Sequence, residues 1–188
     1  MSEEAVRAFF ALEIPDTVRG QLASSLEEVR QGTLRARWTR PQGWHLTLKF
    51  LGEVDRSLLG ELGTELAPQV RGIGAVSVKL AKTGFFPSSS RPRVAWIGGT
   101  AEGIENIVAA VEEVSDRAGF SRERRPWSIH LTLARLKAQW PKAAIERFLE
   151  WGDGLELEAF TCREVVLFSS DLQPGGAVYT ALERYPLV

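Results

Sequence analysis

The sequence predicts an α+β fold in which two similar strand–helix–strand units form one pseudo-symmetric body with a groove between its halves. His45 follows Arg7 by 38 residues and His130 follows Arg93 by 37, and each histidine begins the tetrapeptide His-Leu-Thr-Leu. Two copies are too few, and their period is too long, for a solenoid of stacked repeats. We therefore expect one body assembled from two related halves.

The first unit begins with residues 7–14, an apolar and aromatic run that predicts a strand ended by Pro15. A helix capped by Asp16 and stopped at Gly32 should follow. Its apolar residues recur at helical spacing: Val18, Leu22, Leu26 and Val29. Residues 44–51 then alternate between apolar and polar side chains, which predicts the last strand of the unit.

Between the two units, we expect a helix, a strand and a loop. The helix should end near Pro68, and its apolar stripe consists of Leu58, Leu59, Leu62 and Leu66. Residues 75–86 show the alternation of a strand, and residues 87–90, Pro-Ser-Ser-Ser, predict a loop.

The second unit repeats the order of the first. Residues 93–97 predict a strand, and residues 98–100, Gly-Gly-Thr, predict a turn whose threonine caps the next helix. Such a turn could also hold an anion on its backbone amides. The helix should stop at Gly119, and its apolar stripe consists of Ile104, Ile107, Val108, Val111 and Val114.

After this helix, residues 129–136 predict an alternating strand that contains the second tetrapeptide. A short helix over residues 141–151 should begin at a proline and end at Gly152. Residues 155–168 and 177–185 predict the last two strands.

Composition and charge narrow the class of protein. The chain has 188 residues, a formal net charge of −1 and one cysteine, Cys162. A near-neutral protein has no overall field for a polyanion, so any contact with RNA must come from a local basic patch. We expect a cytoplasmic location without a membrane segment, because a single cysteine forms no internal disulfide and the sequence has no secretory leader and no run of about 20 apolar residues.

The two histidines of the chain lie in matched surroundings, His45-Leu46-Thr47-Leu48 and His130-Leu131-Thr132-Leu133. Because side chains alternate along a strand, each histidine shares a face with its threonine, and the leucines occupy the other face. If a pseudo-two-fold axis relates the halves, the polar faces meet in one groove that holds two imidazoles and two hydroxyls.

This set of groups suits phosphoryl chemistry. One imidazole can accept a proton from water while the other donates a proton to the leaving ribose oxygen. The threonine hydroxyls can donate to the non-bridging phosphate oxygens. Such chemistry requires no metal ion and no cofactor, and acid–base assistance of about 10² to 10⁴ per group is adequate for a strained cyclic phosphate.

Other interpretations of the motifs must be weighed. A single His-x-Thr pair on a strand is usually only its solvated face, although two matched copies make that reading much weaker. A metal site competes, but threonine is a poor ligand and no Asp, Glu or Cys lies within two residues of either histidine. Cys162 lies in a predicted strand, where a cysteine is more often a small buried residue than a nucleophile.

Residues near the motifs could support the groove. By alternation, Lys49 falls on the face of His45 and could steer a phosphate, whereas Arg135 falls on the leucine face unless the strand twists or ends there. A small basic cluster precedes His130 and consists of Arg122, Arg124 and Arg125. We expect these arginines to be solvated, and Trp44 and Trp127 to pack in the core in preference to stacking on bases.

Taken as a set, the motifs resemble the 2H phosphoesterases, specifically the LigT-like RNA 2′,3′-cyclic phosphodiesterases. The match covers almost the whole chain and has four blocks: Arg37-Trp38 with residues 44–53, Phe85-Phe86-Pro87 with residues 93–97, residues 129–135, and residues 167–170 through Tyr179 to Leu187. One departure is Ile129, which stands where the family usually has a proline.

The resemblance implies a bilobal α+β fold with a duplicated antiparallel sheet around a central groove. Residues 1–188 would then form one domain of two intertwined lobes, each with one His-x-Thr motif. It also implies hydrolysis of RNA 2′,3′-cyclic phosphate ends to 2′-phosphates, and a 2′–5′ RNA ligase activity. The expected partners are RNA with a cyclic phosphate end or a cyclic nucleotide, and we expect a monomer.

The same resemblance assigns roles to residues. His45 would be the general acid at the 3′-oxygen and His130 the general base that activates water. Thr47 and Thr132 would bind phosphate oxygens with help from Arg135. Because the two halves are alike, the residues themselves do not say which histidine is the acid and which the base.

Three other functions stay open at this point. The enzyme could act on a small nucleotide such as a 1″,2″-cyclic phosphate or an oligoadenylate. The groove could also belong to a non-catalytic RNA-binding module, or to a metal-dependent hydrolase.

Overall fold

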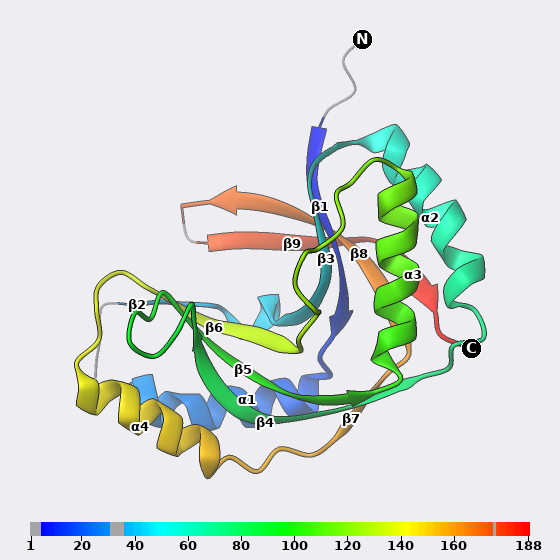
Figure 1. Cartoon of the computed structure of the whole chain (residues 1–188). Coiled ribbons are helices and arrows are strands. Elements are labelled where there is room, and N and C mark those ends of the chain that lie inside the picture. The colour runs from blue at the N-terminus through cyan, green and yellow to red at the C-terminus, as the bar shows by residue number, and fades with distance from the viewer. Residues whose placement is uncertain (1–4, 31–35, 175) are drawn as a thin grey trace.

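The computed structural model describes residues 5–30, 36–174 and 176–188, and it shows an α+β fold with two antiparallel sheets (Figure 1). The predicted helix stop at Gly32 lies outside the described residues. The helices are α1 (Asp16–Arg30), α2 (Arg56–Val70), α3 (Ile104–Arg117) and α4 (Lys142–Asp153), with a short 3-10 turn at Pro41–Gly43. The strands are β1 (Ala5–Glu13), β2 (Ala36–Trp38), β3 (His45–Asp55), β4 (Val76–Phe86), β5 (Val94–Glu102), β6 (His130–Leu136), β7 (Phe160–Cys162), β8 (Glu164–Gln173) and β9 (Gly176–Pro186).

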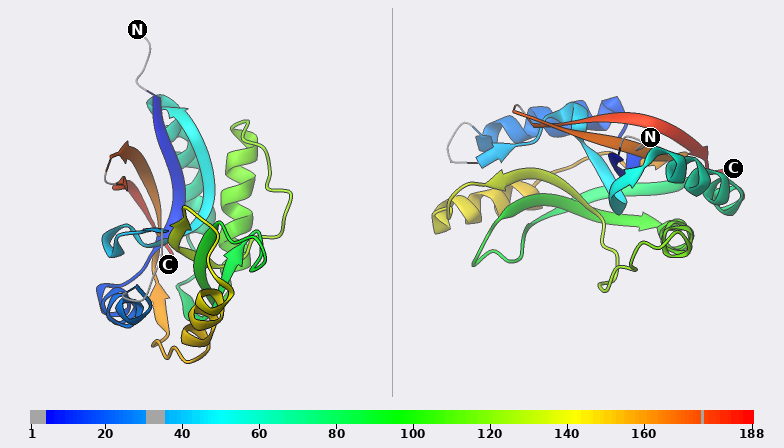
Figure 2. Two further views of the ribbon diagram at one scale, coloured as in Figure 1. Left: turned by 90° about the vertical axis from the view of Figure 1, so that its left-hand side faces the viewer. Right: turned by 90° about the horizontal axis from the view of Figure 1, so that it is seen from above.

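The two sheets are built from different parts of the chain. The first sheet has the order β3-β1-β8-β9 and the second has the order β2-β6-β5-β4-β7. Seen from above in Figure 2, the sheets lie in separate layers, with α1 and α4 together at one side and α2 and α3 together at the other. One cluster of buried apolar side chains extends through both sheets and all four of these helices. The bilobal fold class predicted from the sequence is therefore confirmed.

The duplication is visible in the strand pairing. In the first unit β1 pairs antiparallel with β3, which places Glu13 opposite His45. In the second unit β5 pairs antiparallel with β6, which places Gly98 opposite His130. Each motif strand is thus hydrogen-bonded to the strand that opens its own unit.

Strand β2 breaks the separation between the units. It belongs to the first unit by sequence, yet it pairs with β6 of the second sheet and places Arg37 opposite Arg135. The backbone amide of Thr39, just beyond β2, donates to the carbonyl of Leu133 at 2.9 Å. The sequence pattern did not predict this strand, because three residues are too few to show a period.

The turn predicted at residues 98–100 is wrong, because β5 continues through Gly98 and Gly99 and ends at Glu102. Gly103 precedes α3 with a positive φ of 79°, so Thr100 does not cap the helix and no helix-end anion site forms there. The reason for glycine is packing: a Cβ on Gly99 would lie 1.8 Å from the carbonyl oxygen of Lys79 on β4. Gly99 therefore allows β4 and β5 to approach closely and does not serve a turn.

Two other boundaries differ from the prediction. Helix α2 continues through Pro68 to Val70, since a proline in the last turn costs only one of the final hydrogen bonds. The long strand predicted over residues 155–168 is divided into β7 and β8, and residues 155–159 are not paired. Among the described residues, no helix has the length and apolar character needed to cross a membrane.

Replacing Gly99 by alanine should lower the free energy of unfolding by about 1–3 kcal/mol, because the new methyl group collides with the backbone of Lys79. Urea unfolding measures this change. The matched control is Gly60→Ala in α2, where nothing lies within 4 Å of the added Cβ. That control should gain about 0.5–1 kcal/mol from helix propensity. Equal effects of the two substitutions would contradict the packing role of Gly99.

Candidate active site

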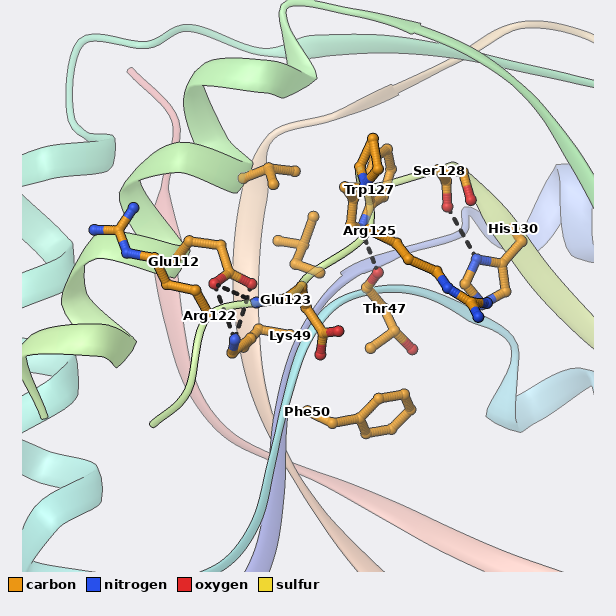
Figure 3. Close-up of a pocket in the computed structure, with 13 residues that line it drawn as sticks. Thr47, Lys49, Phe50, Glu112, Arg122, Glu123, Arg125, Trp127, Ser128 and His130 are labelled. Atoms are coloured by element: carbon orange, nitrogen blue, oxygen red, sulfur yellow. Dashed lines mark hydrogen bonds and ion pairs between the residues drawn. The ribbon is translucent and has the colours of Figure 1, made fainter. Parts of the chain in front are cut away.

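The two histidines occupy equivalent positions, since His45 is the first residue of β3 and His130 is the first residue of β6. Both are half-buried, as are Thr47 and Thr132 two residues later. A cavity of about 350 Å³ is lined by Thr47 of the first motif and His130 of the second (Figure 3). The cavity therefore joins one polar residue of each motif, whereas His45 and Thr132 lie outside its lining.

Each imidazole is held in one tautomer by the backbone that precedes it. Nδ1 of His45 lies 2.8 Å from the carbonyl oxygen of Gly43, and Nδ1 of His130 lies 2.9 Å from that of Ser128. A carbonyl oxygen can only accept, so Nδ1 carries the hydrogen in both rings. Nε2 of each ring is then left to accept or donate the proton used in chemistry.

His45 is surrounded by aromatic side chains of the first sheet. Its ring centroid lies 4.6 Å from that of Phe9 and 4.9 Å from that of Tyr179, whose ring meets it edge-on. Burial among these rings lowers the pKa of His45 to about 4. The hydrogen bond to Gly43 opposes this shift, and the charge of His130 adds to it. At neutral pH the ligand-free protein therefore holds His45 without a charge.

His130 has aromatic neighbours on the second sheet. Phe86 meets its ring edge-on at 5.2 Å, and Phe86 in turn stacks on Trp96 at 5.2 Å. The Trp96 ring lies close over Gly84, where a Cβ would be only 2.4 Å from an indole carbon. A side chain at that position would push Trp96, and through Phe86 it would disturb His130.

Matching bulges follow both motifs. On β3 the pairing with β1 omits Leu48, and on β6 the pairing with β5 omits Leu133. Each bulge reverses the alternation of side chains beyond it. The residue five positions after each histidine therefore returns to the groove face: Phe50 in the first motif and Arg135 in the second.

The bulge on β3 turns Lys49 away from the face of His45 and Thr47, so Lys49 borders the cavity but its charge is paired with Glu112 of α3. Lys49 is only 3% exposed, and its Nζ lies 2.9 Å from the Glu112 carboxylate and 2.7 Å from the carbonyl oxygen of Ser121. Phe50, which is 60% exposed, points to the groove side in its place. The bulge on β6 does the opposite for Arg135, which strict alternation would have sent to the leucine face.

The loop that leads from α3 to His130 is tied to β3. Besides the bond from Lys49 to Ser121, the indole nitrogen of Trp127 donates to the carbonyl oxygen of Thr47 at 2.9 Å. The backbone amide of Glu123 donates to the Glu112 carboxylate at 3.3 Å. The sequence pattern did not predict this anchor, and its one local signal is a lysine between the apolar residues Leu48 and Phe50.

Trp44 forms a second connection between the halves. It is buried, and its indole nitrogen donates to the Thr39 hydroxyl at 2.8 Å. The same hydroxyl lies 2.8 and 2.9 Å from the carbonyl oxygens of Thr132 and Leu133, at the bulge of β6. Trp44 therefore has a core role, as expected, and Trp127 is a half-buried hydrogen-bonding wall of the cavity.

The arginines that precede His130 and the two motif threonines are the remaining candidates. Arg122 and Arg125 line the cavity, and Arg122 is paired with Asp116 at 2.9 Å, while Arg124 is exposed. Figure 3 shows the Arg125 side chain extending toward the part of the cavity where His130 lies. The hydroxyls of Thr47 and Thr132 form no hydrogen bond to another described residue and can donate to a ligand.

Cys162 lies away from this site, in β7 of the second sheet's far edge. Burial raises the pKa of its thiol to about 12, with a smaller contribution from Glu13. Such a thiol is a poor nucleophile. In the part of the chain that the structure describes, no three His, Cys, Asp or Glu side chains are grouped as ligands for one ion.

Comparison with known proteins shows which family this chain is similar to. The family model described as LigT like phosphoesterase matches residues 12–96 and 98–179. An RNA 2′,3′-cyclic phosphodiesterase of Thermus thermophilus is 35% identical over 194 residues, covering 97% of this chain and 90% of the relative. One from Methanocaldococcus jannaschii is 29% identical over 181 residues, covering 96% of this chain and all of the relative.

Solved structures show the same fold. A Thermus thermophilus crystal structure has a TM-score of 0.80 and 27% identity, covering 96% of this chain and 97% of its own. The structure of Escherichia coli LigT complexed with 3′-AMP has a TM-score of 0.76 and 24% identity, covering 98% of this chain and 99% of its own.

Substituting Lys49 by methionine should lower the free energy of unfolding by about 3 kcal/mol, because Glu112 is left partly buried without its partner. Replacing Glu112 by glutamine in the same chain should recover part of that loss. The matched control is Lys142→Met, since Lys142 is 89% exposed and its pair with Glu146 is solvated. That control should change stability by no more than about 0.5 kcal/mol. If both lysine substitutions have the same effect in urea unfolding, the anchor does not contribute as described.

Proposed function

This chain belongs to the LigT like phosphoesterase family, and on that premise we propose that it is a phosphoric diester hydrolase that opens 2′,3′-cyclic phosphates at RNA ends. The observation that carries the proposal is the pair of imidazoles, each with Nδ1 hydrogen-bonded to a carbonyl oxygen and Nε2 left for chemistry. The names of the Thermus and Methanocaldococcus relatives support the substrate class. We also infer that the two sheets are lobes of one domain, since one cluster of buried residues extends through both.

In the proposed reaction, His130 takes a proton from water and the resulting hydroxide attacks phosphorus. The bond between phosphorus and the ribose 3′-oxygen breaks, and His45 donates a proton to that oxygen. The product carries a 2′-phosphate. Thr47 and Thr132 donate to the non-bridging oxygens, where negative charge must be held in the transition state. Arg135, exposed further along the same face of β6, assists by adding a positive charge to the groove.

The low pKa of His45 sets a condition on this assignment. With a pKa of about 4, His45 is uncharged at pH 7 in the ligand-free protein and cannot act as an acid. A bound phosphate anion raises the pKa of a neighbouring imidazole, because an opposite charge favours the protonated form. His45 therefore acquires its proton when the substrate binds.

The same groups can join RNA ends. If a 5′-hydroxyl of RNA takes the place of water, its oxygen attacks phosphorus, the 3′-oxygen leaves, and a 2′–5′ linkage forms. We include this ligation in the proposal, because it uses the same proton transfers and requires no ATP. The acid and base described here supply every proton transfer, so neither reaction in the proposal uses a metal ion or a cofactor.

The first test is hydrolysis of a 2′,3′-cyclic nucleotide in excess chelator, with the position of the product phosphate resolved. We expect a 2′-phosphate, and a loss of about 10² to 10⁴ in kcat for His45→Ala and for His130→Ala. A 3′-phosphate would mean that the 2′-oxygen leaves. Activity lost in chelator would indicate a metal-dependent enzyme. If neither the nucleotide nor an RNA with a cyclic end is hydrolysed, the protein is a binding module.

The pH dependence assigns the roles of the two histidines. Native kcat/KM should be bell-shaped whichever histidine is the acid, so the informative protein is His130→Ala. If His45 is the acid, the residual kcat/KM of this variant falls as pH rises above about 4, because His45 loses its proton there. If kcat/KM instead rises with pH through about 4, His45 is the base and the assignment is reversed.

A further inference from the structure

One end of the groove is basic although the protein as a whole is not. Three segments meet there: residues 36–44 with β2, residues 86–94 between β4 and β5, and residues 134–141 after the motif of β6. They contain no Asp or Glu, and their cations are Arg37, Arg40, Arg91, Arg93, Arg135 and Lys137. The opposite end carries both signs of charge, because Glu112 and Glu123 line the cavity there together with Arg122 and Arg125.

Arg37 lies at the centre of this basic end. It is directly opposite Arg135 in the pairing of β2 with β6, so both side chains leave the same face of the sheet. The neighbours of Arg37 on β2, Ala36 and Trp38, pack on the main core instead. The guanidinium of Arg37 reaches the first sheet, since its Nη2 lies 3.5 Å from the position that a Cβ on Gly176 would occupy. In Figure 1 the end of β8 and the start of β9 lie on the same side of the molecule as β2.

Among the described residues, no acidic side chain is paired with Arg37 or Arg135. Within the described residues, neither Arg37 nor Arg135 makes an ion pair or a hydrogen bond through its guanidinium. Like charges directly opposite each other destabilise a strand pair. An anion bound between them would remove this repulsion and form charge-assisted hydrogen bonds with a guanidinium.

The position of Arg37 separates it from the reacting phosphate. Two residues of β6, Leu133 and Ala134, lie between Thr132 and Arg135, and the three steps span roughly 10 Å along a strand. Arg37 is one strand further out, by about 4.8 Å. An anion held by Arg37 is therefore a second phosphate beyond the one held by the threonines.

We propose that Arg37 is a specificity residue that binds the phosphodiester joining the terminal nucleotide to the one before it. This inference rests on the proposed function. RNA with a cyclic end carries that phosphodiester and a cyclic mononucleotide lacks it. The enzyme therefore prefers an oligonucleotide end, and the RNA strand leaves the groove at the basic end.

The test compares a cyclic mononucleotide with a dinucleotide that ends in a 2′,3′-cyclic phosphate. Native protein should have a kcat/KM for the dinucleotide about 10- to 100-fold higher, the factor that a hydrogen bond to a charged group provides. Arg37→Gln should abolish that preference and change mononucleotide kcat/KM by less than twofold. A dinucleotide with an uncharged methylphosphonate linkage should lose the preference in native protein. The control is Arg56→Gln, an exposed arginine at the start of α2.

The outcomes separate the two proposals. If Arg37→Gln keeps the preference, or slows both substrates equally, Arg37 is not the second phosphate site. If native protein hydrolyses neither substrate, the proposed function fails, and binding of a labelled RNA with a 2′-phosphate end still tests Arg37. In that assay, Arg37→Gln should reduce the slope of log K against log salt by about 0.7, the value for one phosphate contact on a single strand. An unchanged slope would overturn the inference.

Discussion

The relative position of the two histidines depends on hydrogen bonds that cross from one half of the molecule to the other. Lys49 and the carbonyl of Thr47, both on the strand that begins with His45, hold the loop that ends at His130. Thr39 holds the backbone just after Thr132 in return. Because an ammonium group as buried as that of Lys49 is costly without partners, the Glu112 carboxylate and the Ser121 carbonyl must stay in place. The loop therefore cannot shift without exposing an unpaired charge, and the distance between the imidazoles is fixed by that constraint.

The bulges give the duplicated motifs their chemical difference. Both strands use the same four residues and the same omitted leucine, so both halves present a histidine, a threonine and then the residue five positions after the histidine. In the first half that residue is Phe50, which packs near Phe9, the aromatic neighbour of His45. In the second half it is Arg135, so the same position carries an exposed positive charge. A symmetric backbone thus carries an asymmetric environment, which is what an acid and a base working on one phosphate require.

The sequence predicts the helices and the motif strands correctly because the pattern that indicates each one lies within its own residues. The stripe of Val18, Leu22, Leu26 and Val29 is buried as its spacing predicts, and alternation places His45 with Thr47. The bulge at Leu48 escapes prediction because it depends on the register of β1, and nothing near Leu48 in the sequence encodes that register.

The turn predicted at residues 98–100 of β5 is wrong for a similar reason. Gly98-Gly99 is a common turn signal, and the crowding that requires glycine comes from distant backbone, that of Ile129 at Gly98 and that of Lys79 at Gly99. The partner of Lys49 is also distant, since Glu112 follows it by 63 residues. Periodicity therefore identifies which residues share a face, whereas the contacts that position those faces require the tertiary structure.

The exchange of β2 into the second sheet has a consequence for how the chain is made. Synthesis proceeds from the N-terminus, and His130 follows Trp38 by 92 residues, so the partner of β6 exists long before β6 does. Without β2, β6 would be the open edge of its sheet, with a row of unpaired amides and carbonyls next to the catalytic groove. Such an edge invites pairing with another chain and aggregation. The swapped strand covers this edge of β6, where a foreign strand would also lie beside the second motif.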